Sequence, residues 1–472
     1  MNKELTLSFF LLFISLNIFG YQREAASKNT LPNIILINVD DMGWRDTGFM
    51  GSQFYETPNL DLLASKGMVF NQAYAAAANC APSRACMMSG ENTPRHGVYT
   101  VANSDRGKSE NRKLVPTVNN PTIADHHLLF AELLQQNGYI TCHSGKWHIS
   151  KDPLTRGFDV NIGGSDAGNP GSYYPPYKNV PSIQSTNDDY LTDLVMDKTL
   201  DFLANNQEQP FFLNYSPYAV HTPIQPVADL LEKYLGKSPS NGQSDAKYAT
   251  MVENLDRNIG RLIDLLQEKK LFENTFIFFV TDNGGLFKVT KQRPLRAGKG
   301  SYYEGGIRIP AFVVWPGRIR PGQVSEVPIT NLDIFPTLLE LAGIEKPENK
   351  NLDGISLLPL LTAGKNLPKR PFFWHFPIYL EGGNAESQDP VFRTRPGSAI
   401  RYGDWKLIQY FEKGELELYN LKEDISESNN LVNDRPDKAK ELLTLLENWR
   451  ESTHAPIPET LNPDFIAKKV TN

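Results

Sequence analysis

The sequence Ile34-Ile-Leu-Ile-Asn-Val39 is a short apolar run, and two acids, Asp40 and Asp41, follow it directly. Residues 211–215 and 276–280 form two further runs that are rich in branched or aromatic side chains and also lead straight into polar residues. Runs of this length and composition predict strands that are buried on both faces of a sheet. Ligands of such sheets bind beyond the carboxyl ends of the strands, so the polar residues after these runs are expected to share one site.

Helical patterns separate the predicted strands. Residues 58–66 follow Thr57, a candidate helix cap, and place Pro58 in the first turn. Residues 123–137, 248–269 and 331–342 are further predicted helices, and 248–269 carries apolar residues at helical spacing. Strands that alternate with helices predict an α/β fold, with a large, mixed but mostly parallel sheet sandwiched by helices.

The composition changes near residues 368–371. Short strand patterns follow at 372–375, 398–402, 406–411 and 416–420, and a helical pattern covers 438–449. This order predicts a small α+β domain with an antiparallel sheet. Because a chain of 472 residues is too long for one small core, we expect a main domain at 27–370, which would hold the site, and a C-terminal subdomain at 371–472.

The first 26 residues have the pattern of a signal peptide. Lys3 gives a weak positive start, and small and polar residues follow an apolar stretch at 7–19. This stretch is short for a membrane span, although a single N-terminal anchor is the alternative. No later run is apolar enough to span a bilayer. We therefore expect an exported protein with no stable membrane span after signal removal, in the periplasm or, alternatively, outside the cell.

Charge and cysteine content exclude two classes of protein. The formal net charge of -6 excludes a generally basic surface that coats nucleic acid. The cysteines are Cys80, Cys86 and Cys142, and so small a number argues against a disulfide scaffold. Because the number is odd, at least one thiol is left over, and in an exported chain that thiol needs an explanation.

Oxygen ligands follow two of the predicted strands. Asp40 and Asp41 follow the first, and Asp282 and Asn283 come soon after the run at 276–280. Such donors suit a hard divalent cation, Ca²⁺ rather than Zn²⁺, since no thiolate or histidine set accompanies them. A lone Asp is more commonly a helix cap or turn former. Two acids after one strand and an Asp-Asn pair after another instead predict one metal ion per chain, Ca²⁺ with Mg²⁺ as the alternative.

The segment Cys80-Ala-Pro-Ser-Arg84-Ala-Cys-Met-Met-Ser-Gly90 carries a candidate nucleophile. A Cys at the start of a helix, with an Arg four residues on, suits chemistry on an anion. The alternative is a buried structural Cys, which is how most free cysteines behave.

This segment resembles the C-x-P-S-R signature of the type I, formylglycine-dependent sulfatases, within the alkaline-phosphatase superfamily. Ser89 stands where Thr is more usual, and the hydroxyl is retained. The resemblance covers residues 32–345 and implies an alkaline-phosphatase-like fold, while residues 418–431 resemble the family's C-terminal domain. The other matching motifs, in the family's order along the chain, are Asp40-Asp41, Gly138-Tyr-Ile-Thr-Cys-His-Ser-Gly-Lys146-Trp-His148, His221-Thr-Pro, Thr281-Asp-Asn-Gly284 and Gly298-Lys299-Gly-Ser-Tyr-Tyr-Glu304-Gly-Gly-Ile-Arg-Ile-Pro310.

The resemblance implies that a formylglycine-generating or sulfatase-maturating enzyme oxidises Cys80 to formylglycine (3-oxoalanine), an aldehyde. Hydration gives a geminal diol bound to the metal, so position 80 is also an expected metal ligand. One hydroxyl, activated by the metal and by Asp282, attacks the sulfate sulfur, and the substrate alcohol leaves. The other hydroxyl then loses its proton and expels sulfate, which restores the aldehyde. This modification accounts for the unpaired thiol.

The remaining motif residues have roles that the same resemblance implies. Lys146 and Lys299 are expected to bind the sulfate oxygens, and Arg84 the formylglycine hydroxyls. His148 is expected to hydrogen-bond the diol and assist sulfate release. His221 is expected to protonate the leaving oxygen, with Lys299 as the alternative donor.

Residues outside the motifs are candidates for contact with the rest of the substrate. His375, Arg393 and Arg395 are expected to bind neighbouring anionic groups. Residues 163–177 are rich in Gly, Tyr and Pro, which suits a loop whose aromatic rings stack on sugars. Residues 288–299 carry five basic residues and no acid, a pattern that would attract a polyanion. Packing of the loop aromatics and a solvated charged loop are the respective alternatives.

The predicted function is hydrolysis of a carbohydrate sulfate ester, because the chain resembles bacterial polysaccharide sulfatases. Algal polysaccharides such as ulvan or carrageenan, and animal glycosaminoglycans, are candidate substrates. A phosphate mono- or diester hydrolase is one alternative, since superfamily members share the metal site, but the C-x-P-S-R signature argues against it. A sulfated-glycan-binding pseudoenzyme is the other. It would be expected to lack at least one catalytic residue, and all are present.

Overall fold

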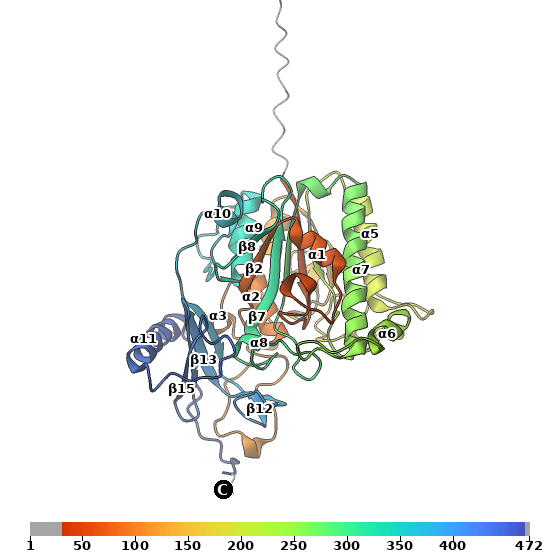
Figure 1. Ribbon diagram of the computed structural model, residues 1–472. Coiled ribbons are helices and arrows are strands. Elements are labelled where there is room, and N and C mark those ends of the chain that lie inside the picture. The colour runs from red at the N-terminus through yellow and green to blue at the C-terminus, as the bar shows by residue number, and fades with distance from the viewer. Residues whose placement is uncertain (1–30, 468–472) are drawn as a thin grey trace, which may run out of the picture. The chain divides into compact units, whose positions relative to one another are not determined.

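A nine-stranded sheet runs through the centre of the computed structural model, which describes residues 31–467 (Figure 1). Within this sheet β7 is antiparallel to both of its neighbours, and the other pairs are parallel. The predicted mixed, mostly parallel sheet is therefore confirmed. In order across the sheet the strands are β4 (Val160–Ile162), β3 (Ile140–Gly145), β5 (Phe211–Ser216), β1 (Asn33–Val39), β6 (Thr275–Thr281), β7 (Arg308–Val314), β2 (Met68–Tyr74) and β8 (Gln323–Ser325), with β9 (Ile329–Thr330) also paired to β2.

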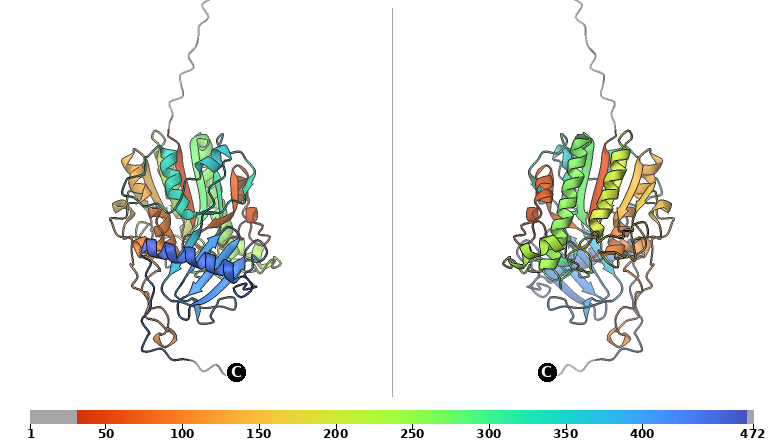
Figure 2. Two further views of the ribbon diagram at one scale, coloured as in Figure 1. Left: turned by 90° about the vertical axis from the view of Figure 1, so that its left-hand side faces the viewer. Right: turned by 90° about the vertical axis from the view of Figure 1, so that its right-hand side faces the viewer.

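Helices cover both faces of this sheet (Figures 1 and 2). Along β1, Ile35 and Ile37 enter one hydrophobic core, whereas Ile34 and Leu36 enter the core on the opposite face. Burial on both faces explains why the strand reads as a continuous apolar run. The first core packs against α1 (Pro58–Ser65), α5 (Leu191–Asn205), α6 (Ala228–Leu235) and α7 (Ala246–Glu268), and the second against α2 (Cys80–Ser89), α4 (Phe130–Gln136), α9 (Ile334–Ala342) and α10 (Leu358–Ala363). Two short helices, α3 (Thr93–His96) and α8 (Glu304–Ile307), lie in connections.

Two local expectations are corrected by the structure. The helix expected from residue 123 begins at Phe130, because the Glu132 carboxylate accepts the backbone N–H of Leu129 and closes the first turn there. Thr57 does not cap α1 with its side chain. Its hydroxyl instead accepts the N–H of Gly48 at 2.7 Å and donates to Asp61 at 2.9 Å, which ties α1 to the preceding loop.

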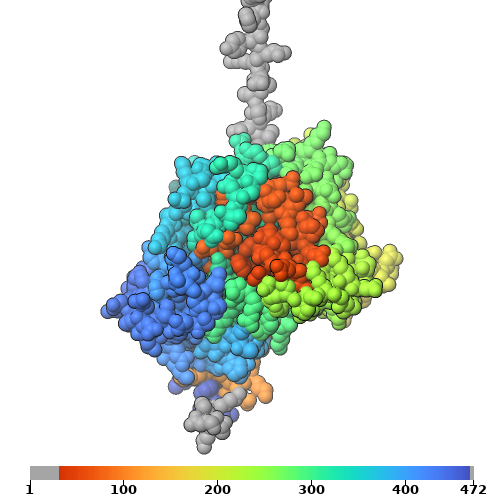
Figure 3. All heavy atoms as spheres, in the orientation of Figure 1, coloured from red at the N-terminus to blue at the C-terminus, as the bar shows by residue number. Residues whose placement is uncertain are grey.

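The C-terminal part holds a four-stranded antiparallel sheet, as predicted. Its strands, in order, are β10 (Phe372–Phe376), β13 (Gly397–Tyr402), β14 (Trp405–Tyr410) and β15 (Glu415–Asn420). The helix α11 (Pro436–Thr453) lies across this sheet, seen in the left view of Figure 2, and buries Leu442 and Leu446 against Leu407. The other face of the C-terminal sheet packs against the main domain. There Ile408 belongs to a hydrophobic cluster that also contains Tyr303. In Figure 3 these C-terminal residues, in blue, form one corner of the surface.

A two-stranded antiparallel sheet completes the C-terminal part, formed by β11 (Leu380–Glu381) and β12 (Phe392–Thr394). The described chain from Pro32 onward clusters into one compact unit, so the division at residue 370 stays a prediction. The predicted signal peptide at 1–26 lies outside the described residues. Among the helices of residues 31–467, none has the length and apolar character that a membrane crossing requires.

Candidate active site

A pocket of about 470 Å³ opens where strands of the main sheet end. His148 follows β3, His221 follows β5, and Lys299 lies in the long connection after β6. The structure thus brings together polar residues that the strand pattern placed at one edge of the sheet. The residues that line the pocket are Asn79, Cys80, Val101, Ala102, Arg106, His148, Asp166, Gly168, Asn169, His221, Lys299, Leu380, Glu381, Gly382 and Arg393.

Cys80 is the first residue of α2, so its thiol lies at a helix N-terminus, which favours negative charge. The Nζ of Lys299 donates a hydrogen bond to its Sγ at 3.5 Å. Burial acts to raise the pKa of the Cys80 thiol, but the ammonium groups of Lys146 and Lys299 outweigh it and hold the pKa below its ordinary value. For Cys142, burial alone raises the pKa far above the ordinary value. All three cysteines are free, and Cys80 is the one in a cationic pocket.

Three carboxylates and three cations form a buried group beside this thiol, which we call the catalytic cluster. Removing so many charges from water is costly unless they are paired. Arg84 also donates to the backbone carbonyl of Lys146 at 2.9 Å and to the hydroxyl of Ser216, which fixes its orientation. The cluster's ion pairs are Lys146 Nζ to Asp40 Oδ2 at 2.7 Å, Lys299 Nζ to Asp41 Oδ1 at 2.6 Å and Arg84 Nε to Asp282 Oδ2 at 2.8 Å.

The oxygens of this cluster fit a divalent cation. Asp40 Oδ1 and Asn283 Oδ1 are buried and make no hydrogen bond to any residue in the described range 31–467. Arg84 Nη2 lies 3.9 Å from Asp40 Oδ1, too far for a hydrogen bond. Buried acceptors without a hydrogen bond are unfavourable, and a hard cation bound by them would satisfy both. Donor atoms of Asp40, Asp41, Cys80 and His221 all lie within 4.8 Å of one another. The donor set is therefore compatible with one bound cation.

Two details of this ligand group differ from expectation. The two carboxylate oxygens of Asp282 already accept the Nε–H of Arg84 and the backbone N–H of Asp41, the latter at 3.2 Å. Asp41 is occupied to a similar extent, because its Oδ1 accepts Asn283 Nδ2 at 2.9 Å and lies 2.6 Å from Lys299 Nζ. His221, which was assigned to proton transfer, has its Nε2 at 3.6 Å from Asp41 Oδ2 and so lies within the same group.

The two site histidines have defined orientations. In His221, Nδ1 lies 2.7 Å from the carbonyl of Thr222 and must donate to it, so Nε2 is the nitrogen that faces the pocket without a proton when the ring is neutral. Burial lowers the pKa of His221 to about 4 although Asp41 opposes this. His148 has a left-handed backbone φ of 69° and packs on Gly168, where a Cβ would lie 2.7 Å from its ring. That close approach requires glycine at position 168.

The candidate substrate residues of the C-terminal part separate into two groups. Arg393 lines the pocket, as expected, but His375 and Arg395 do not. The ring nitrogens of His375 bond Ser398 Oγ at 2.8 Å and the carbonyl of Pro456 at 3.0 Å. Arg395 pairs with Asp389 and with Glu412. The expectation that His375 and Arg395 face the substrate is therefore corrected, because both side chains are occupied inside the C-terminal part.

The loop at 163–177 contributes polar groups rather than aromatic platforms. Tyr173 and Tyr177 are buried, and the ring of Tyr173 stacks on Tyr190 with centroids 5.4 Å apart. Asp166 and Asn169 of the same loop instead line the pocket. The aromatic rings of this loop therefore pack within the protein, which was the alternative to sugar stacking.

The basic residues at 288–299 do not form a continuous cationic path. Arg293 pairs with Glu386, and the Nζ of Lys291 lies 2.9 Å from the ring centroid of Phe287. Within this stretch only Lys299 lines the described pocket. A steering role for the whole stretch is not supported by these contacts.

Sequence reasoning did not name five polar residues of the pocket: Asn79, Arg106, Asp166, Asn169 and Glu381. Arg106 and Glu381 meet across 275 positions of the chain, with Nη2 2.7 Å from Oε1, and no local pattern announces such a contact. Asp166 and Asn169 had a usable signal, since they are polar residues in a glycine-rich loop that follows a strand.

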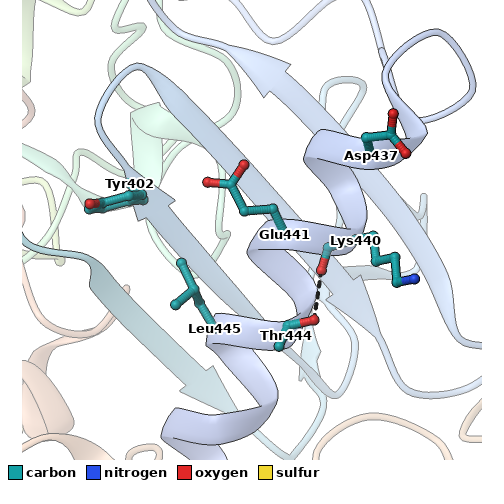
Figure 4. A pocket seen from close by; sticks show the side chains of 6 residues that line it. All are labelled: Tyr402, Asp437, Lys440, Glu441, Thr444 and Leu445. Carbon is teal, nitrogen blue, oxygen red and sulfur yellow. Dashed lines mark hydrogen bonds between the residues drawn. The ribbon is translucent and has the colours of Figure 1, made fainter.

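A second hollow, of about 570 Å³, lies on α11 (Figure 4). Its lining residues are Tyr402, Asp437, Lys440, Glu441, Thr444 and Leu445. The Thr444 hydroxyl donates to the carbonyl of Lys440 at 3.0 Å, so it is occupied within its own helix. Its polar residues Asp437, Lys440, Glu441 and Thr444 are all exposed, so none has the burial that alters the reactivity of a group, and the pocket at Cys80 is the candidate active site.

Comparison with known proteins gives a consistent result. A family model described as Sulfatase matches residues 32–344, and one described as N-sulphoglucosamine sulphohydrolase, C-terminal, matches residues 298–452. N-acetylgalactosamine-6-sulfatase of Canis lupus familiaris is 34% identical over 74% of this chain and 70% of its own length. A protein of Formosa agariphila named Sulfatase is 31% identical over 91% of this chain and 90% of its own length.

Solved structures share the fold. The crystal structure of Ps i-CgsB in complex with k-i-k-neocarrahexaose is similar with a TM-score of 0.75 and 30% identity, covering 91% of this chain and 96% of that one. Phosphonate monoester hydrolase of Agrobacterium radiobacter, at 18% identity and a TM-score of 0.68, covers 89% of this chain and 96% of that one. At that identity the second likeness shows the fold alone.

Proposed function

We propose, from the premise that this chain belongs to the sulfatase family and is a sulfuric ester hydrolase, that its substrate is a sulfated carbohydrate. The observation that carries this proposal is the make-up of the pocket. Cys80 and Lys299 lie beside a wall that presents Asp166, Asn169 and Glu381. Carboxylates and amides are the groups that hydrogen-bond sugar hydroxyls, whereas an aryl group would call for an apolar wall.

The similar proteins support the same substrate class. One is named for N-acetylgalactosamine 6-sulfate chemistry, and another is a crystal structure in complex with a neocarrahexaose. A sulfated polysaccharide or its oligosaccharides is therefore our proposed substrate. Algal polymers such as carrageenan or ulvan, and glycosaminoglycans, are the members to test first.

Chemistry at position 80 needs more than a thiol. We propose that a maturation enzyme converts Cys80 to formylglycine, whose hydrate would supply the attacking hydroxyl and, through its second hydroxyl, a route for sulfate to leave. Sulfatases generally bind a divalent metal, and we propose one Ca²⁺ per chain, with Mg²⁺ as the alternative, held by Asp40, Asp41 and Asn283 together with position 80 and Asp282. When bound, the cation would withdraw charge from the sulfate oxygens and favour an ionised nucleophile.

The chain's own residues then have separable tasks. Lys146 and Lys299 bind the sulfate oxygens, since their ammonium groups are the cations that lower the pKa of the residue 80 thiol, and Lys299 Nζ lies 3.5 Å from its Sγ. Arg84 holds the Asp282 carboxylate through its Nε at 2.8 Å and thereby orients one side of the site. His221 Nε2 faces the pocket and can protonate the leaving oxygen only from the imidazolium form, since Nδ1 donates to Thr222; Lys299, which keeps its protons, is the alternative donor. His148 completes the wall beside position 80 and assists sulfate release.

A panel of defined sulfated oligosaccharides tests the proposal, with each product located by NMR. We expect loss of sulfate from a single position of at least one carbohydrate. Matched aryl sulfate and aryl phosphate esters form the control, and a clear preference for the phosphate ester would contradict the proposed reaction. Intact mass of the peptide that contains residue 80 would show the thiol-to-aldehyde change in active material. Fractionation of the native host would test the proposed export to the periplasm.

A further inference from the structure

Arg393, on β12, is an unpaired guanidinium in the pocket wall. Within residues 31–467 its side chain makes no hydrogen bond or ion pair, although it is half-buried. Its neighbours are different: Arg395, two positions on, pairs with Asp389, and Arg106 pairs with Glu381. The carboxylates of Asp41 and Glu381 attract Arg393 from a longer distance, but a partly desolvated cation without a hydrogen-bonded partner is unfavourable in the folded protein. Its place in the pocket indicates that a partner comes with the ligand.

The stem of Arg393 is fixed next to the reacting groups. A Cβ built on Gly300 would lie 3.1 Å from the Cδ of Arg393, so the side chain packs directly on that backbone. Gly300 also has a φ of +87°, which favours glycine independently. The preceding residue, Lys299, hydrogen-bonds Cys80 Sγ. Arg393 therefore lies beside the group that binds the scissile sulfate, but it reaches the pocket from a different part of the chain.

Among the cations that line the pocket in the described chain, Arg106 and Lys299 have ion-pair partners and Arg393 has none. Arg106 is neutralised by Glu381, whose Oε1 accepts its Nη2 at 2.7 Å. Glu381 Oε2 is buried without a hydrogen bond in the described chain and can accept a sugar hydroxyl. A guanidinium cannot accept a hydrogen bond, and its planar fork of N–H groups matches an oxyanion better than a hydroxyl.

We infer that Arg393 binds a second oxyanion of the substrate, a carboxylate or a second sulfate, close to the sulfate that is removed. The inference rests on the proposed function and narrows it: the preferred carbohydrate carries two negative groups near one another. A uronate carboxylate and a second sulfate present the same chemistry to the guanidinium, and the substrates chosen for the test distinguish them.

The test compares three variants on matched substrates. Each sulfated sugar of the panel is supplied alone, with a neighbouring uronate, and with a second sulfate on the same or the adjacent ring. Arg393→Gln is compared with Arg393→Lys and with Arg435→Gln, which removes an exposed arginine outside the pocket. We expect Arg393→Gln to raise KM for the doubly anionic substrate about 10- to 100-fold, the range for a lost charge-assisted hydrogen bond, with kcat little changed. Arg393→Lys should restore part of the affinity, and Arg435→Gln should match the unaltered protein.

The outcomes separate the inference from the function on which it rests. Wild-type preference for the doubly anionic sugar, lost in Arg393→Gln, supports it, and the preferred substrate shows whether the anion is a carboxylate or a sulfate. Equal loss on singly and doubly anionic sugars would place Arg393 at the scissile sulfate and overturn the inference while the function stands. Absence of any preference in the unaltered protein would also overturn it. If no carbohydrate in the panel is desulfated, the proposed function itself fails and the inference falls with it.

Discussion

Two groups of buried charges in this molecule both consist of carboxylates paired with cations. They differ in whether all of their acceptor oxygens are bound by protein donors. One is the catalytic cluster. The other, which we call the junction cluster, lies where the C-terminal sheet meets the main one and is centred on Lys406 of β14. Lys406 Nζ lies 3.0 Å from Glu304 Oε1 and 2.8 Å from Glu427 Oε1. The second oxygen of Glu304 accepts the hydroxyl of Tyr74 at 2.7 Å.

The difference lies in what the protein leaves unbound. All carboxylate oxygens of Glu304 and Glu427 lie within 3.0 Å of a protein donor, whereas Asp40 Oδ1 and Asn283 Oδ1 of the active site are buried without a hydrogen bond in the described chain. Burial and ion pairing are common to both groups and indicate no function by themselves. Open lone pairs beside a pocket distinguish the site that binds a cation and an anion from the one that joins two sheets.

The largest expected effect is on the catalytic side. Because we propose that position 80 supplies the nucleophile, Cys80→Ala should lower sulfate release by about 10⁴-fold or more, while unfolding stability changes little. Initial rates and chemical denaturation measure the two quantities. Cys142→Ala is the matched control: that thiol is buried in β3, away from the pocket, so activity should persist with a loss of about 1 kcal/mol of stability. Full desulfation by Cys80→Ala would refute the mechanism.

The junction cluster should respond in the opposite way. Lys406→Met leaves Glu304 and Glu427 buried without their shared cation, and we expect the free energy of unfolding to fall by about 3–5 kcal/mol. Activity per folded molecule should remain because no residue of the junction cluster lines the pocket. Denaturant titration measures the stability, and the rate of sulfate release per folded molecule measures the activity. A stable but inactive variant would show that the two clusters are coupled.

Cation binding should act on one cluster only. For protein freed of metal with a chelator, adding Ca²⁺ to about 100 times its Kd should raise the free energy of unfolding by about 3 kcal/mol. Asp41→Asn should abolish the gain, and Lys406→Met should keep it. The readout is denaturation with and without Ca²⁺, so activity is not needed. Retention of the full gain by Asp41→Asn would place the cation elsewhere.

The smallest expected effect is a pH dependence of the junction. Burial raises the pKa of Glu427 from its ordinary value of 4.5 to about 7, although Lys406 opposes this. The folded state thus binds a proton that the unfolded state has lost, so this contribution to stability is complete below about pH 4.5 and disappears as the pH rises to about 7. Glu427→Gln should make the free energy of unfolding less dependent on pH in this range. Denaturation at pH 5 and pH 7 measures the difference, and an unchanged slope would contradict the assignment.

Three of the nine strands of the main sheet were predicted, because these strands are buried on both faces. Continuous apolar runs mark such strands, and β1, β5 and β6 were found within a residue or two of their ends. The reversed direction of β7 was not predictable, since strand direction depends on the connection and not on the run itself. The late start of α4 was missed for a similar reason, because a single carboxylate, that of Glu132, decides it.

Predictability of the site followed the same division. The catalytic cluster was found because its residue types occur in recognisable order along the chain. Lys299 and Glu304 show the limit: they belong to one motif, yet one joins the catalytic cluster and the other the junction cluster. His375 looked available in the sequence because its partner, the carbonyl of Pro456, lies 81 positions away. Contacts across such distances carry no local signal.

The pocket draws its lining from two sources: reacting residues at the strand ends of the main sheet, and Glu381 and Arg393 from β11 and β12. The two sets lie far apart in the sequence. Glu381 and Arg393 belong to a two-stranded hairpin, β11–β12, that is separate from the main sheet. Mutations in that hairpin can therefore change which sugar is admitted while the chemistry is inherited intact.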